Sequence, residues 1–180
     1  SIAAYERAQR LDPALITSVG QTFLLLNDWE RALAVGRSTP SIAKPTALFQ
    51  LGRTDDAVST IRPFLEKPGL HPQLRTAFET MTAAFESRWD EVLRFTRVLS
   101  ESPFTDPEGF FHWAGALAMA GDRDGALELL ERSMEVGFYP ASALASSPNL
   151  APLRATPDFR HIVRRAEERH REALEAFRAA

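Results

Sequence analysis

Four histidines are the residues of this sequence best suited to metal binding or acid–base chemistry: His71, His112, His161 and His170. No two of them lie three or four residues apart, which is the spacing that places two imidazoles on one helical face around zinc. His161 and His170 lie nine residues apart, without a convergent pair of carboxylates beside them. We therefore interpret the histidines as surface or edge residues and predict no metal site.

Other motifs with chemical meaning are incomplete. Gly121 to Gly125 resembles the start of a calcium loop, but the twelfth position from Asp122 is Ser133, which cannot supply a bidentate carboxylate. The glycines form no phosphate-binding loop, and no Gly-x-Ser-x-Gly elbow occurs. Acidic pairs such as Asp55-Asp56 are adjacent, and helical neighbours point about 100° apart. With no cysteine for thiol chemistry, the sequence predicts neither an enzyme active site nor a cofactor.

Composition narrows the class of protein further. The 180 residues are 44% hydrophobic, as expected of a folded chain, and the formal net charge of −3 gives no electrostatic case for nucleic acid. No stretch approaches the roughly 20 apolar residues that span a bilayer, so we expect a cytoplasmic protein without a membrane segment. Nearly all basic residues are arginine, which favours a bacterial source. The chain opens inside an amphipathic pattern without Met, which is typical of a fragment.

One short turn pattern occurs four times along the chain. Each copy has a small or polar turn residue, then charged residues, then Ala or Val, between runs with helical apolar spacing. The interval from Ala32 to Ala57 is about 25 residues, and the next two intervals, to Val92 and then to Ala126, are each about 34 residues. The turns are Asn27-Asp28-Trp29-Glu30-Arg31-Ala32, Gly52-Arg53-Thr54-Asp55-Asp56-Ala57, Ser87-Arg88-Trp89-Asp90-Glu91-Val92 and Gly121-Asp122-Arg123-Asp124-Gly125-Ala126.

Residues 1–137 resemble the tetratricopeptide repeat (TPR) family, a helix–turn–helix unit with a period of about 34 residues. Gly20 and Phe23 precede the first turn at the spacing expected of the first helix, and residues 1–13 resemble the end of a repeat. The resemblance implies an all-α, right-handed superhelical stack of repeats. The turns near 27, 52, 87 and 121 need residues that tolerate left-handed dihedrals.

The short interval between Ala32 and Ala57 departs from the family pattern. Pro40 and Pro45 interrupt it, so both helices between Asp28 and Leu51 should be short or offset. We expect a local kink there. It is either a hinge or binding notch, or drift in a degenerate repeat.

Residues 138–180 form a degenerate turn region followed by a capping helix. Asp106-Pro107 and Thr156-Pro157 predict helix starts at residues 107 and 157. On the last helix an apolar stripe faces away from most of its charges, as an end cap requires. The stripe comprises Phe159, Ile162, Val163, Ala166, Ala173, Leu174 and Phe177. This region resembles the C-terminal ends of TPR arms in bacterial signalling proteins, notably kinases, cyclases and transcriptional regulators.

The resemblance also implies a binding surface, because the first helices of TPR repeats line a concave wall. Mostly apolar residues occupy those positions, and such surface usually marks a partner site. We predict a non-catalytic scaffold that binds a peptide or partner protein there. The wall lacks the Lys and Asn array that clamps a terminal carboxylate. The predicted contact residues are Thr17, Gln21, Leu24, Phe49, Gln50, Met81, Phe85, Phe111, His112 and Met119.

Two other functions remain open at this point. The chain could be a structural or dimerisation arm, pairing through the last helix or the region around Pro40 and Pro45. It could also be a sensor module with a hydrophobic small molecule inside the stack. The identity of the partner and the oligomeric state are not predicted.

Overall fold

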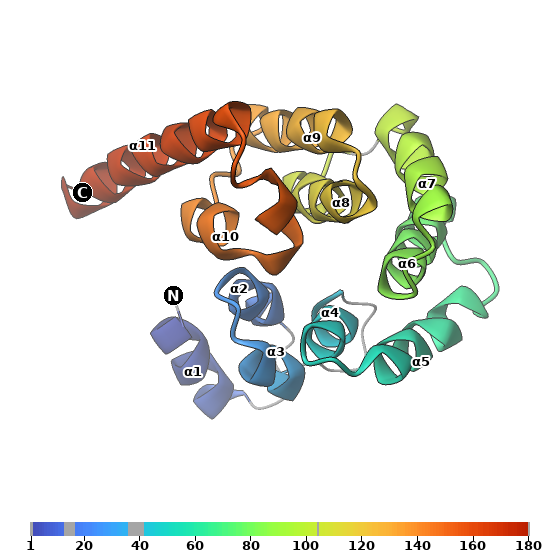
Figure 1. The fold of residues 1–180 in the computed structure, drawn as a ribbon. Helices are drawn as coiled ribbons and strands as arrows, with labels where there is room; N and C mark the ends of the chain where they lie inside the picture. The colour runs from blue at the N-terminus through green and yellow to red at the C-terminus, as the bar shows by residue number, and fades with distance from the viewer. Residues whose placement is uncertain (1, 13–16, 36–41, 104, 180) are drawn as a thin grey trace. The chain divides into compact units, whose positions relative to one another are not determined.

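The computed structural model describes residues 2–12, 17–35, 42–103 and 105–179 of the chain (Figure 1). Within these residues every regular element is a helix, so the all-α prediction is confirmed. In chain order the elements are α1 (Ile2–Leu11), α2 (Val19–Leu25), α3 (Trp29–Val35), α4 (Ala43–Gln50), α5 (Thr54–Leu65), α6 (Pro72–Phe85), α7 (Trp89–Glu101), α8 (Pro107–Ala120), α9 (Arg123–Glu135), α10 (Ala141–Ser146), the 3₁₀ helix η1 (Pro148–Leu153) and α11 (Pro157–Ala179).

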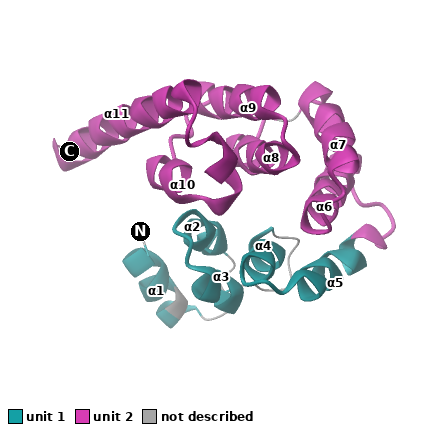
Figure 2. Ribbon diagram, in the orientation of Figure 1, with its two compact units in different colours: residues 1–64 teal, residues 65–180 magenta. Residues whose placement is uncertain are grey.

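The helices form two compact units (Figure 2). Unit 1 comprises residues 1–64 and unit 2 comprises residues 65–180. In unit 1, α2, α3 and α4 pack against one another. In unit 2, α6 packs on α7, α8 packs on both α7 and α9, and α11 packs on α9 and α10. Helices therefore pack mainly on their neighbours in the sequence, as they do in repeat proteins.

The four predicted turns are closed by the same two backbone hydrogen bonds. At the third turn, the amide of Ser87 donates to the carbonyl oxygen of Ala84, and the amide of Arg88 donates to that of Ala83. This is the Schellman pattern, which satisfies two carbonyl groups at a helix end and needs a residue at positive φ. Equivalent bonds occur at Asn27, Gly52 and Gly121, and all four turn residues have positive φ, as predicted.

A small side chain follows each turn residue by five positions. Ala32, Ala57, Val92 and Ala126 are all 0% exposed. The amide of each donates to the carbonyl oxygen four residues earlier, which is the first bond of the second helix. The predicted close-contact positions therefore coincide in all four copies.

Burial in the first helices follows the same register. The residues nine positions before the small side chains are buried, and so are those twelve positions before them. These residues are Phe23, Leu48, Ala83 and Leu117, and then Gly20, Pro45, Thr80 and Ala114. At Gly20 two helices approach closely, because an added Cβ would lie 2.9 Å from the Cβ of Ala43 on α4. One burial pattern thus underlies the repeated sequence pattern.

The helices of the short interval are themselves short, as predicted. α3 has 7 residues and α4 has 8, whereas α6 has 14 and α7 has 13. Pro45 is the third residue of α4, where its missing amide proton interrupts no intrahelical hydrogen bond. Pro40 lies outside the described residues.

Residues 138–180 keep the repeat period although their first helix is broken. Asp122 and Thr156 each cap the following helix by accepting a hydrogen bond from the third helical amide, of Gly125 at 3.0 Å and of Phe159 at 3.3 Å. These two caps lie one repeat period apart in the sequence. The predicted degenerate region is therefore a further hairpin, in which α10 and η1 take the place of one continuous first helix.

Only the first half of α11 covers the rest of its unit. Phe159, Ile162 and Ala166 are buried, but every residue from 167 to 179 is exposed. Leu174 is 37% exposed and Phe177 is 81% exposed. The predicted apolar stripe thus extends beyond the surface that it caps.

Candidate binding surfaces

An apolar face of α6 is the first candidate surface. Leu74, Ala77 and Met81 follow one another at helical spacing and therefore share this face, which we call the α6 face. Leu74 is 46% exposed, and Ala77 and Met81 are partly exposed. Phe85, one turn further along, is buried. Of the predicted contact residues on α6, Met81 thus keeps accessible surface and Phe85 packs into the unit.

The predicted contact face of α8 is covered by the chain's own residues. The ring of Phe111 is buried and meets the ring of Phe138 edge-on, at 6.1 Å between centroids. At Gly115, an added Cβ would lie 3.1 Å from the Cβ of Asn149 in η1. Met119 is partly buried against a cluster of small side chains on α6, α7 and α8. The broken hairpin therefore occupies much of the face that we predicted for a partner.

His112, also on α8, lies beside a carboxyl group of its own helix. Its Nε2 lies 3.7 Å from Oε1 of Glu108, one turn earlier. Both atoms are buried, and neither has a hydrogen-bond partner in the described part of the chain. Nowhere in that part do three or more His, Asp or Glu residues come together in a group that could hold a metal ion.

The predicted contact residues of unit 1 differ in accessibility. Leu24 is buried in the core with Phe23 and Ala32. Thr17 is exposed, and its Oγ1 accepts a hydrogen bond from the amide of Val19 at 3.3 Å. Gln21, Phe49 and Gln50 are partly exposed. In unit 1, four of the five predicted contact residues thus keep accessible surface.

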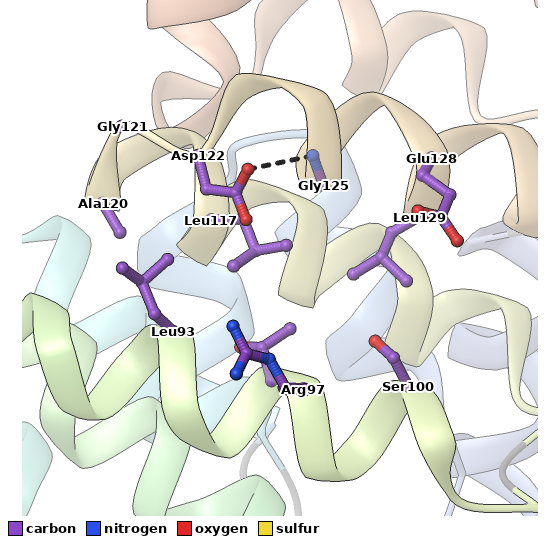
Figure 3. Close-up of a pocket in the computed structure, with 11 residues that line it drawn as sticks. Leu93, Arg97, Ser100, Leu117, Ala120, Gly121, Asp122, Gly125, Glu128 and Leu129 are labelled. Atoms are coloured by element: carbon purple, nitrogen blue, oxygen red, sulfur yellow. Dashed lines mark hydrogen bonds between the residues drawn. The ribbon is translucent and has the colours of Figure 1, made fainter.

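A cavity of about 420 Å³ lies between α7 and the hairpin of α8 and α9 (Figure 3). Leu93, Arg97 and Ser100 of α7 face the turn that carries Asp122 and the first turns of α9. Thr96 also lines the cavity, and its Oγ1 is buried without a hydrogen-bond partner among the described residues. Since polar and charged groups interrupt the leucines, this cavity does not offer the continuous apolar lining that a hydrophobic small molecule needs.

Two of these features were not predicted from the sequence. Leu74 lies seven residues before Met81, so extending the apolar stripe of α6 by two turns would have found it. Thr96 was not predicted, because it stands out only when equivalent positions of the repeats are compared. It stands four residues after Val92, where the equivalent residues Ile61 and Leu130 are apolar and buried.

Comparison with known proteins found no relative of this chain. No protein-family model, no curated protein and no solved structure matched the chain. Among the described residues, none of the helices combines the length and apolar character needed to cross a membrane.

Proposed function

We propose that this chain is a TPR-like scaffold, without catalytic activity of its own, that holds a segment of another protein. The repeated hairpin of unit 2 carries the proposal. Ser87 and Gly121 close identical turns one repeat period apart, and Val92 and Ala126 are fully buried at the same position. A period of about 34 residues and burial between neighbouring hairpins are the properties of TPR arrays, whose stacked helices present extended binding surfaces.

The α6 face supplies the contact surface in this proposal. It exposes Leu74 and part of Met81, and methionine adapts to partners of varied shape. An amphipathic helix that lays its apolar side against this face would bury surface that is now in water. The face of α8 contributes less, because Phe138 and Asn149 already pack on it.

Affinity capture with matched variants tests the proposal. The chain would be immobilised and exposed to a lysate of its source organism, in wild-type form and as Leu74→Glu combined with Met81→Glu. The control combines Val98→Glu with Val136→Glu, which places the same charges on apolar side chains that are 52% and 54% exposed elsewhere in unit 2. We expect a partner that the wild type and the control both retain and the α6 variant loses by at least about tenfold.

Equal capture by all three forms would count against the α6 face, because it would place the contact on another surface. Loss of thermal stability would instead make the double variant uninformative about binding. Leu74→Glu alone resolves the second case, because Leu74 is solvent-facing in the first turn of α6, where a carboxylate favours the helix.

A dimerisation arm is the second candidate function, and the exposed half of α11 favours it. Leu174 and Phe177 lie on one side of a helix end that nothing in the described chain covers. Static light scattering would show a dimer that dissociates in a variant with Leu174→Glu and Phe177→Glu. A monomer at all concentrations would remove this candidate.

A further inference from the structure

The arginines of α11 fall into two groups that differ in their partners. Arg165 donates to Glu131 of α9 at 2.5 Å, and Arg169 donates to Glu172 at 2.9 Å. The pairing with Glu172 also raises the pKa of Arg169. In contrast, Arg160 and Arg164 are exposed, and neither has an acidic partner among the described residues. Arg165 and Arg169 are thus held in ion pairs, whereas Arg160 and Arg164 are not.

The two unpaired arginines border a groove between α10 and α11. This groove has a volume of about 340 Å³ and is lined by Ala145, Arg154, Phe159, Arg160, Val163, Arg164 and Glu167. Its accessible apolar part comes from Ala145 of α10 and Val163 of α11, because Phe159 is only 2% exposed. We call it the arginine groove.

Arg154 adds a third positive charge in a defined position. Its Nη2 donates to the carbonyl oxygen of Ser147 at 2.8 Å, which ties the guanidinium to the loop before η1. A guanidinium has five donors, so most of them remain available to a ligand. With Glu167 as the one acidic residue of the lining, the groove carries three positive charges and one negative charge. The whole chain has a net charge of −3, so the positive charge of the groove is opposite in sign to the net charge of the molecule.

The arginine groove fits an acidic peptide with an apolar anchor, and we propose that it binds such a segment of a partner protein. The volume of the groove is near the lower end of the range for ligand pockets, so it admits one or two bulky side chains rather than a large cofactor. Arg160 and Arg164 are one helical turn apart, so their guanidinium groups can meet carboxylates that are also one turn apart. Guanidinium pairs with carboxylates in a bidentate geometry, which gives the contact direction as well as charge.

This proposal does not rest on the α6 face, since the groove lies on different helices of unit 2. If an acidic peptide fails to bind the arginine groove, the proposed scaffold function of the α6 face is not affected. Conversely, the α6 variant Leu74→Glu should bind the peptide as the wild type does. The two proposals therefore fail separately.

Fluorescence anisotropy on the whole 180-residue chain tests the proposal directly. The probe is a labelled peptide of about twelve residues with glutamates one turn apart around a central leucine and phenylalanine. A second peptide has glutamine in place of every glutamate, and a third has alanine in place of the two apolar anchors. We expect the first peptide to bind and the other two to bind at least about tenfold more weakly.

Protein variants assign the binding to the groove. Arg160→Gln combined with Arg164→Gln should weaken the acidic peptide by about tenfold, and added salt should reduce this difference. Arg171→Gln combined with Arg178→Gln is the matched control, because it removes the same charge from exposed positions on the same helix. Ala145→Trp is a second, independent variant. Ala145 is exposed, so the indole ring of tryptophan should fill the groove without disturbing the fold.

Four results would overturn the proposal. The acidic peptide could fail to bind, or both double variants could weaken it equally, which would indicate a nonspecific charge effect. Vesicles containing phosphatidylglycerol could bind in an Arg160- and Arg164-dependent manner while the peptide does not, which would make the ligand a membrane surface. Self-association lost with the same two arginines would identify a second copy of the chain as the occupant.

Discussion

The hairpin at Asn27 in unit 1 and the hairpin at Gly121 in unit 2 build the same turn but use helices of different length. The turns at Asn27 and Gly121 share the same hydrogen bonds and the same buried small residue five positions on. Yet α2 and α3 have 7 residues each, whereas α8 has 14 and α9 has 13. The turn and its close contact therefore define the repeat, and helix length is the part that varies.

Helix length determines how much each hairpin can bury. A 7-residue helix is about 10 Å long; α2 buries four residues, Phe23 and Leu24 among them, and α3 buries Ala32 alone. In α9, five side chains are buried: Ala126, Leu129, Leu130, Ser133 and Met134. Since burial of apolar area is the main favourable term in folding, unit 2 should be the more stable region.

Ala126→Arg gives the largest expected effect and tests the shared register. Ala126 is fully buried, so the substitution places an unpaired charge in the hairpin of α8 and α9. We expect a loss of about 4 kcal/mol or more in the free energy of unfolding, measured by urea denaturation followed by circular dichroism. Ala32→Arg in unit 1 should cost less, because the short α3 can open locally.

Glu128→Arg is the control for this prediction, because it introduces the same side chain at an exposed position of α9. It should change the unfolding free energy by less than about 0.5 kcal/mol. Native stability in Ala126→Arg would mean that the burial register of unit 2 is wrong. An equal loss in Ala32→Arg would remove the proposed difference between the units.

Hydrogen exchange should show the same contrast without any substitution. The amides of α2 and α3 belong to short helices, which together bury five residues against thirteen in α8 and α9, so we expect them to open with a free energy at least about 2 kcal/mol below that of α8 and α9. Exchange measured by mass spectrometry on peptic peptides would resolve the four helices. Uniform protection across both units would show that they open together.

A smaller effect comes from exchanging the turn residues. Ser87 has φ of 57° and Gly121 has φ of 87°, so a serine stands at one turn where a glycine stands at the next. Ser87→Gly should stabilise the chain by about 0.5 kcal/mol, and Gly121→Ser should destabilise it by about 1 kcal/mol. Thermal unfolding of both variants measures the pair. Changes of the same sign would show that backbone strain is not what distinguishes these turns.

The repeat was predictable because it is local. Asn27, Gly52, Ser87 and Gly121 carry their turn preference in their own side chains, and the small residue that follows lies at a fixed distance. Helix caps at Asp106 and Thr156 were equally visible, because a cap needs only the residues of one turn. Such features require no knowledge of what packs where.

The candidate surfaces were less predictable because they depend on distant parts of the chain. Phe111 has the position of a partner-contact residue, but Phe138, which follows α9 in the sequence, covers it. Arg160 and Arg165 look alike in the sequence, and only the structure shows that Glu131 neutralises the second. Which arginine is free thus depends on how α11 is rotated against α9.

Acid titration gives the smallest expected effect, and it compares the first helical turns of α3 and α7. A hydrogen bond from Arg31 to Asp28, 2.6 Å from its Nε, lowers the pKa of that carboxyl, and one from Arg88 lowers the pKa of Glu91. A carboxyl with a lowered folded pKa stabilises the fold above its unfolded pKa, and that contribution disappears as the pH falls through the folded value. Urea midpoints should therefore decrease below about pH 4.5, the ordinary value for glutamate.

Asp28→Asn and Glu91→Gln should each slightly reduce the decrease of the urea midpoint at acid pH, which we call the acid limb, because each removes one titrating group. The change should be small, since the partner arginines are solvent-exposed or nearly so and water and salt screen the pairs. Midpoints measured between pH 7 and pH 3 in low and high salt would separate the two contributions. If Asp28→Asn affects the limb and Glu91→Gln does not, the acid sensitivity resides in unit 1. That result would extend the contrast between the two units from helix length to charge.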